Sequence, residues 1–164
     1  MPASRGKALL VLMLVAAALV ALMGGFGPAR TLDKLPWYTA TEGLNLLSDL
    51  GPEGRLRYLR NECLDLGFLF VYSVFAFIAT GWIWEGRLSA QGVRRGQYLS
   101  LLPGLVDLTE TSLVISALRG YPSGLPAKIT WLCLATPAKW LAAAVLVASA
   151  LGGTALNYLG PKPR

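Results

Sequence analysis

The chain has 164 residues, of which 54% are hydrophobic and 15% are charged, and its mean hydropathy is +0.52. A soluble domain carries about 25% charged residues, so this composition argues against a soluble protein and indicates a membrane protein. The formal net charge of +6 comes from basic residues beside apolar stretches, a pattern that favours membrane orientation over nucleic-acid binding.

Four apolar stretches approach the length of about 20 residues that a helix needs to cross a bilayer. They cover residues 8–25, 63–84, 98–118 and 129–151. Together they hold about half of the chain, and the rest is divided among one long connection, two short ones and a brief tail, which leaves no room for a separate soluble domain. The sequence therefore predicts an all-α integral membrane protein: one domain over residues 1–164, built as an antiparallel bundle of four transmembrane helices, with a short amphipathic helix on the outer side between the first two.

The first stretch, residues 8–25, has two interpretations. Basic residues before it and small residues after it are also typical of a cleaved secretory signal peptide. An uncleaved helix is favoured, because the run is longer than a signal core and because small residues recur at every fourth position, which suits close helix packing. These residues are Ala17, Ala21 and Gly25.

The connection over residues 27–61 is predicted to contain the amphipathic helix, at residues 40–50. Leucines recur there at helical spacing, Thr39 or Thr41 can cap its start, and Gly51 can end it. This helix is expected to lie in the headgroup layer with its leucines toward lipid. The alternative for the segment is an ordinary ordered loop packed on the helix bundle.

Beyond Gly51, the second long helix is predicted to begin outside the hydrocarbon with a charged segment. Arg57 and Arg60 are three positions apart, so they share a face of this helix. We expect them either to bind a lipid phosphate or to pair with Glu53 and Glu62 on a solvated face.

Basic residues near the helix ends predict the orientation in the membrane. The connection between the second and third helices carries Arg87, Arg94 and Arg95 against Glu85 alone, whereas the longer connection mixes both signs. The positive-inside rule then places the N-terminus and the C-terminus in the cytoplasm. The composition and the short loops are typical of a bacterial inner-membrane protein.

Charged residues occur halfway along the last two apolar stretches, where a charge costs a few kcal/mol on insertion scales. Asp107, Glu110 and Thr111 lie three and four positions apart, on one face of the third helix. Lys139 falls at the same depth on the fourth helix, because a short turn joins the two. The sequence thus predicts a buried ion-pair network between these helices.

The predicted site extends to neighbouring polar residues. Pro137 frees a backbone carbonyl in the fourth helix, which predicts a polar pocket that includes Thr136. Trp140 is expected either to line this pocket or to pack elsewhere. On the second helix, Asp65 and Tyr72 fall on a common face and continue the polar line outward.

Several chemistries find no support in the sequence. The chain has no histidine, which removes the usual metal ligand and general base, and it contains no nucleotide-binding or nucleophile motif. Cys63 and Cys133 are predicted to be buried free thiols, with a disulfide as the alternative. No metal and no cofactor is predicted.

These features leave three hypotheses for function. The favoured one is a non-enzymatic protein that binds a lipid or small ligand, or serves as an accessory subunit of a membrane complex. The second is a proton- or cation-coupled transporter that works as an oligomer. The third is a membrane-embedded, lipid-modifying enzyme with isomerase-like acid–base chemistry, in which Asp107, Glu110 and Lys139 would be catalytic. The predicted partners are membrane lipids and either a larger membrane complex or further copies of the chain, without nucleic acid.

Overall fold

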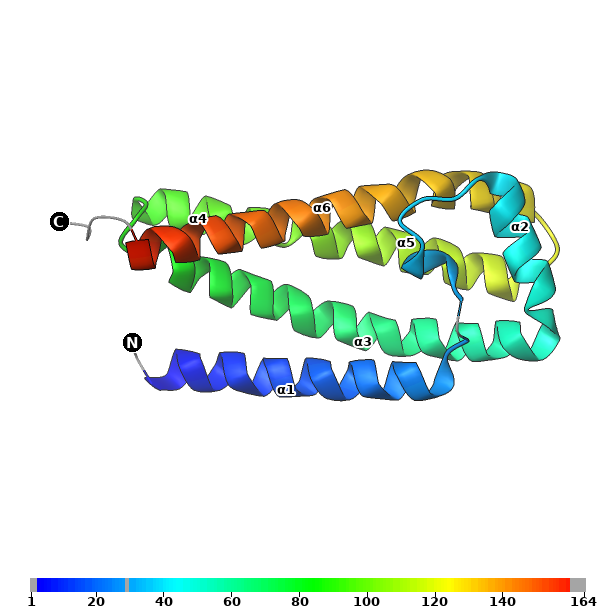
Figure 1. The fold of residues 1–164 in the computed structure, drawn as a ribbon, viewed down its shortest axis with the longest axis horizontal. Helices are drawn as coiled ribbons and strands as arrows, with labels where there is room; N and C mark the ends of the chain where they lie inside the picture. Colours follow the sequence, from blue (N-terminus) through cyan, green and yellow to red (C-terminus); the bar gives the residue numbers. More distant parts are fainter. Residues whose placement is uncertain (1–2, 29, 160–164) are drawn as a thin grey trace.

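The computed structural model describes residues 3–28 and 30–159, and these residues contain helices and no β-strand. In chain order, the helices are α1 (Ala3–Phe26), the short 3-10 helix η1 (Leu32–Lys34), α2 (Ala40–Asp49), α3 (Gly51–Trp84), α4 (Ala90–Leu99), α5 (Leu102–Arg119) and α6 (Leu125–Leu159). Figure 1 shows how they are arranged.

Four helical segments of the described chain are long and apolar enough to cross a membrane: Ser4–Gly25, Gly51–Trp84, Ala90–Arg119 and Leu125–Leu159. This confirms the predicted all-helical fold with four such helices. The third segment joins α4 to α5 and begins earlier than the apolar pattern indicates. Ser89 explains the early start, because its hydroxyl accepts a hydrogen bond from Gly92 N at 3.2 Å and so caps α4.

The long helices pack in a simple series, with α1 on α3, α3 on α5, and α5 on α6. In Figure 1, the start of α1 and the end of α6 lie at the same end of the molecule, which we call the terminal end. The opposite end carries α2, and we call it the capped end. Most large buried apolar side chains gather there: Leu32, Tyr38, Leu47, Tyr58, Val114, Ala117, Leu118, Leu125, Ile129 and Leu132.

Helix α2 packs on the other helices at the capped end. Its Leu47 is 0% exposed, and a Cβ added to Gly43 would lie 2.9 Å from Ile129 Cγ2 on α6. The segment is thus a helix, as the first interpretation predicted, but its leucine face lies against protein instead of toward lipid, as in the packed alternative.

The start of α2 is fixed by a capping box. Thr39 Oγ1 accepts a hydrogen bond from Glu42 N at 3.2 Å, and Glu42 Oε2 accepts one from Thr39 N at 2.7 Å. The Thr39 backbone N–H, and then its hydroxyl, hold the pKa of Glu42 below its usual 4.5. Because the folded pKa is lowered, the stabilisation by this carboxylate is complete above pH 4.5 and is lost as the pH falls through the lowered value.

We expect Thr39→Ala to destabilise α2 by about 1 kcal/mol, the usual cost of losing an N-cap side chain. Amide hydrogen exchange should show faster exchange along α2, with little change in α5. Thr41→Ala is the matched control, because Thr41 is exposed within the same helix. Equal exchange rates in the two variants would show that the cap does not stabilise the helix.

Candidate functional site

The predicted buried ion pairs are present between α5 and α6. Lys139 Nζ lies 2.7 Å from Glu110 Oε2 and 3.4 Å from Asp107 Oδ1. The side chains of Lys139, Glu110 and Asp107 are 15%, 0% and 11% exposed. One ammonium group therefore serves two carboxylates in an interior where an unpaired charge is costly. We call these three residues the central cluster.

Hydroxyl groups bind the remaining carboxylate oxygens of the central cluster. Thr136 Oγ1 on α6 donates to Glu110 Oε1 at 2.8 Å, and Tyr72 OH on α3 donates to Asp107 Oδ2 at 3.0 Å. The Tyr38 hydroxyl lies 3.3 Å from Thr136 Oγ1 and extends the network to the connection before α2. The structure thus joins residues from α3, α5, α6 and this connection into one network.

Asp65 and Thr111 form a separate contact beside this network. Thr111 Oγ1 on α5 donates to Asp65 Oδ2 on α3 at 3.2 Å. Thr111 is fully buried and Asp65 is half-buried. This bond holds α3 against α5 one helical turn from Asp107.

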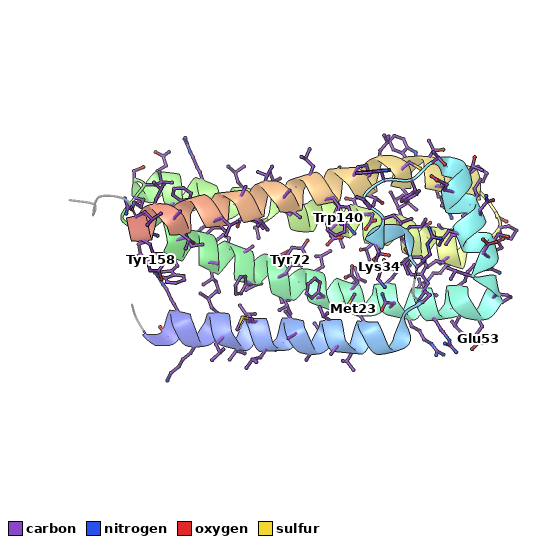
Figure 2. All side chains as sticks on the ribbon, in the orientation of Figure 1. Met23, Lys34, Glu53, Tyr72, Trp140 and Tyr158 are labelled. Atoms are coloured by element: carbon purple, nitrogen blue, oxygen red, sulfur yellow. The ribbon has the colours of Figure 1, made fainter. Side chains whose placement is uncertain are left out.

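Three predicted site residues lie away from this interior. Trp140 on α6, labelled in Figure 2, is 46% exposed, and its ring centroid is 5.9 Å from Lys139 Nζ, so the ring lies beside the central cluster without being buried in it. Arg57 pairs with Glu53 at 2.8 Å on an exposed face. Arg60 is exposed on the same helix.

Glu62 is a correction to the expected solvated face, because its side chain is buried and the residue is 1% exposed. Tyr58 and Asn61 on the same helix are also buried, at 0% and 2%. A signal for this face exists in the sequence, since residues 58, 61, 62 and 65 follow helical spacing. Tyr38 carries no comparable signal, because it comes from a connection rather than from a long helix.

The cysteines are free, as predicted. Cys133 is half-buried, whereas Cys63 is exposed on α3. Cys63 therefore corrects the expectation that both thiols are buried, because the polar stripe of α3 turns inward and leaves Cys63 on the outer side of the helix.

A groove of about 570 Å³ runs along α6 toward the terminal end. Its walls are almost wholly apolar and come from α3, the following connection, α4, α5 and α6. The residues are Thr80, Trp84, Leu88, Gly96, Leu99, Ser100, Leu102, Pro103, Ala138, Leu141, Ala142, Val145, Leu146 and Ser149. Ala138 directly precedes Lys139, and Pro103 lies one turn before Asp107, so the groove ends at the level of the central cluster.

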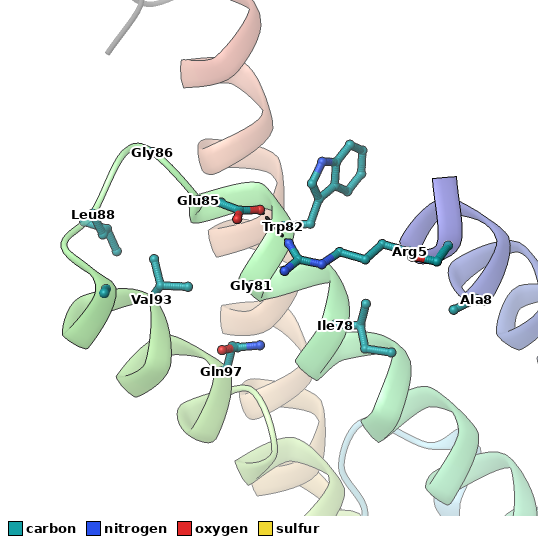
Figure 3. Close-up of a pocket in the computed structure, with 12 residues that line it drawn as sticks. Arg5, Ala8, Ile78, Gly81, Trp82, Glu85, Gly86, Leu88, Val93 and Gln97 are labelled. Carbon is teal, nitrogen blue, oxygen red and sulfur yellow. Dashed lines mark hydrogen bonds and ion pairs between the residues drawn. The ribbon is translucent and has the colours of Figure 1, made fainter. Parts of the chain in front are cut away.

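A second pocket, also of about 570 Å³, lies at the terminal end between α1, the end of α3 and α4. Figure 3 shows Arg5 of α1 reaching across it to Glu85, and Arg5 Nη1 lies 2.6 Å from Glu85 Oε2. These two charges neutralise each other, so the ion pair ties α1 to α3 and presents no net charge to a ligand.

The fold and the site define a class of protein: a small helical protein with four helices long enough to span a membrane and a buried cluster of two acids and one lysine. Searches against protein-family models, curated proteins and solved structures find no match to this chain.

Proposed function

We propose that this chain is an integral membrane protein, an antiparallel four-helix bundle that binds a lipid or a lipid-like amphiphile without chemical change. The apolar groove beside α6 is the observation that carries the proposal. It lies along three segments that are long and apolar enough to span a membrane. In a bilayer, a hydrocarbon chain is the chemically matched occupant of such a groove.

The terminal end of the groove suits a phosphate headgroup. Arg94 and Arg95 of α4 are exposed next to Gly96, which lines the groove. If both chain termini face the cytoplasm of a bacterial inner membrane, these two cations meet the anionic headgroups of the inner leaflet. The proposed ligand therefore has an acyl or isoprenoid chain in the groove and an anionic group at α4.

In this proposal the central cluster has a structural role. Glu110 accepts hydrogen bonds from both Lys139 and Thr136 of α6, which fixes the register of α5 against α6. In this proposal the cluster marks the inner end of the groove and limits the length of chain that fits. Buried polar groups are well suited to this task, since a shifted register would leave a charge unpaired.

We expect Ala142→Phe to remove bound lipid, because a phenyl ring at this position fills the groove. Native mass spectrometry of protein extracted gently from its own membrane should show a retained lipid in the parent and a loss of most of it in the variant. Ala144→Phe is the matched control, since Ala144 is exposed on the same helix outside the groove.

The same spectra can contradict the proposal. If the parent protein retains no amphiphile, or if the two variants retain equal amounts, the groove is not a lipid-binding site. A second polypeptide at fixed ratio would instead identify an accessory subunit, and a change of stoichiometry in Ala144→Phe would identify a contact between copies of the chain.

One observation favours proton- or cation-coupled transport as a second candidate. Polar contacts run without interruption from Tyr38 near the capped end through Thr136, Glu110 and Lys139 to Asp107, which is the form of a proton relay. Reconstituted vesicles under a membrane potential test it directly. Parent vesicles that pass protons or cations no faster than vesicles with Glu110→Gln would exclude this role.

A further inference from the structure

A second polar cluster lies at the capped end, outside both the groove and the central cluster. Tyr58 of α3 organises it, since its hydroxyl accepts a hydrogen bond from Leu32 N at 3.0 Å and donates one to Asp33 Oδ1 at 2.8 Å. Tyr58 and Leu32 are both 0% exposed. The chain that follows α1 is therefore held tightly against α3.

Three buried oxygen atoms in this cluster have no hydrogen-bond partner: Thr31 Oγ1, Asn61 Oδ1 and Glu62 Oε2. Their residues are 0%, 2% and 1% exposed. Asn61 and Glu62 follow Tyr58 by three and four positions, so they share its face of α3. Asn61 faces the chain after α1, because its Oδ1 lies 2.9 Å from the position that a Cβ on Gly27 would take.

The cluster has more acidic than basic groups. The acidic side chains whose charges act on Glu62 are Asp33, Asp65 and Glu110. The basic side chain that acts on Glu62 is Lys139, and its ammonium group already contacts two other carboxylates. A buried carboxylate in such surroundings requires a further positive charge or a proton.

We propose that Thr31, Asn61 and Glu62 bind a small monovalent cation, with Na⁺ as the test ion. Hydroxyl, amide and carboxylate oxygens are the ligands that hard cations prefer. Glu62 supplies one negative charge among neutral oxygens, which balances a single positive charge.

The experiment measures the thermal unfolding midpoint of the full chain in detergent at one fixed pH. NaCl replaces N-methylglucamine chloride at constant ionic strength, so that general screening does not change. We expect the midpoint to rise with Na⁺ and to saturate, as linkage requires of an ion that binds the folded state. Glu62→Gln should abolish this rise, whereas Asp49→Asn, at an exposed acid of the capped end, should keep it.

Two further variants keep the test decisive if Glu62→Gln does not fold. Thr31→Val and Asn61→Ala each remove one proposed ligand, and each should weaken the apparent Na⁺ affinity by about tenfold or more. A parent midpoint that ignores Na⁺ but rises on acidification would overturn the proposal in favour of a protonated Glu62. The proposal would also be overturned if the unfolding midpoints of Thr31→Val and Asn61→Ala rise with Na⁺ as much, and at the same concentrations, as that of the parent. Neither outcome bears on lipid binding in the groove.

Discussion

Replacement of Lys139 by methionine is expected to lower the free energy of unfolding by about 3–5 kcal/mol, the cost of breaking a buried ion pair by removing one partner. Methionine preserves most of the side-chain volume but leaves Glu110 and Asp107 buried without their ammonium group. We expect a large fall in the thermal unfolding midpoint and a reduced yield of folded protein.

Two further variants separate the effect of the lost charge on stability from the effect of lost packing. Lys34→Met is the matched control, because Lys34 is exposed, and its midpoint should stay close to that of the parent. Adding Glu110→Gln and Asp107→Asn to Lys139→Met removes the stranded carboxylates, so the triple variant should recover part of the lost stability. A Lys139→Met protein as stable as the parent would show that the central cluster is not structural.

The buried ion pairs were predictable from the sequence because depth in adjacent helices can be counted from the turn that joins them. Lys139 and Glu110 occupy matching positions on either side of that turn, and their charged atoms are 2.7 Å apart. The all-helical fold with four long apolar helices followed from hydropathy alone, since few other patterns hold so many apolar residues in a row.

Other parts of the site depend on tertiary contacts that cannot be predicted from hydropathy. Tyr38 reaches Thr136 because the connection before α2 folds back over the helices. Glu62 is buried because α3 turns that face inward, whereas a glutamate near a helix end is usually solvated. The groove is lined by residues of both α4 and α5, which are separate helices although the apolar pattern predicts one continuous segment across their junction.

Two adjacent glycines near the end of α6, Gly152 and Gly153, differ in how they pack within the chain. The fourfold spacing of Ala144, Ala148 and Gly152 predicts a small-residue face for contact between copies of the chain, which is a separate matter from packing within one chain. In the structure Gly153 is the buried one. A Cβ added to Gly153 would meet Ile83 Cγ2 and would lie 3.0 Å from Trp84 Cε2, whereas a Cβ on Gly152 would meet nothing within 4 Å.

We therefore expect Gly153→Leu to destabilise the terminal end by about 1–3 kcal/mol, the usual cost of overpacking a tight contact. The leucine would push α6 away from α3. That shift would strain the hydrogen bond from Asn157 Nδ2 to Ile83 O, which is 2.7 Å long. Thermal unfolding in detergent should show a lower midpoint, and hydrogen exchange should accelerate at the ends of α3 and α6.

Gly152→Leu is the matched control for this prediction. It adds the same side chain one position earlier, in open space, so the unfolding midpoint should be close to that of the parent. If Gly152 instead contacts another copy of the chain, its substitution should change the oligomeric state by native mass spectrometry without changing the contact of α3 with α6. Equal destabilisation by the two substitutions would contradict the packing of α6 on α3, because the structure gives only Gly153 a neighbour to displace.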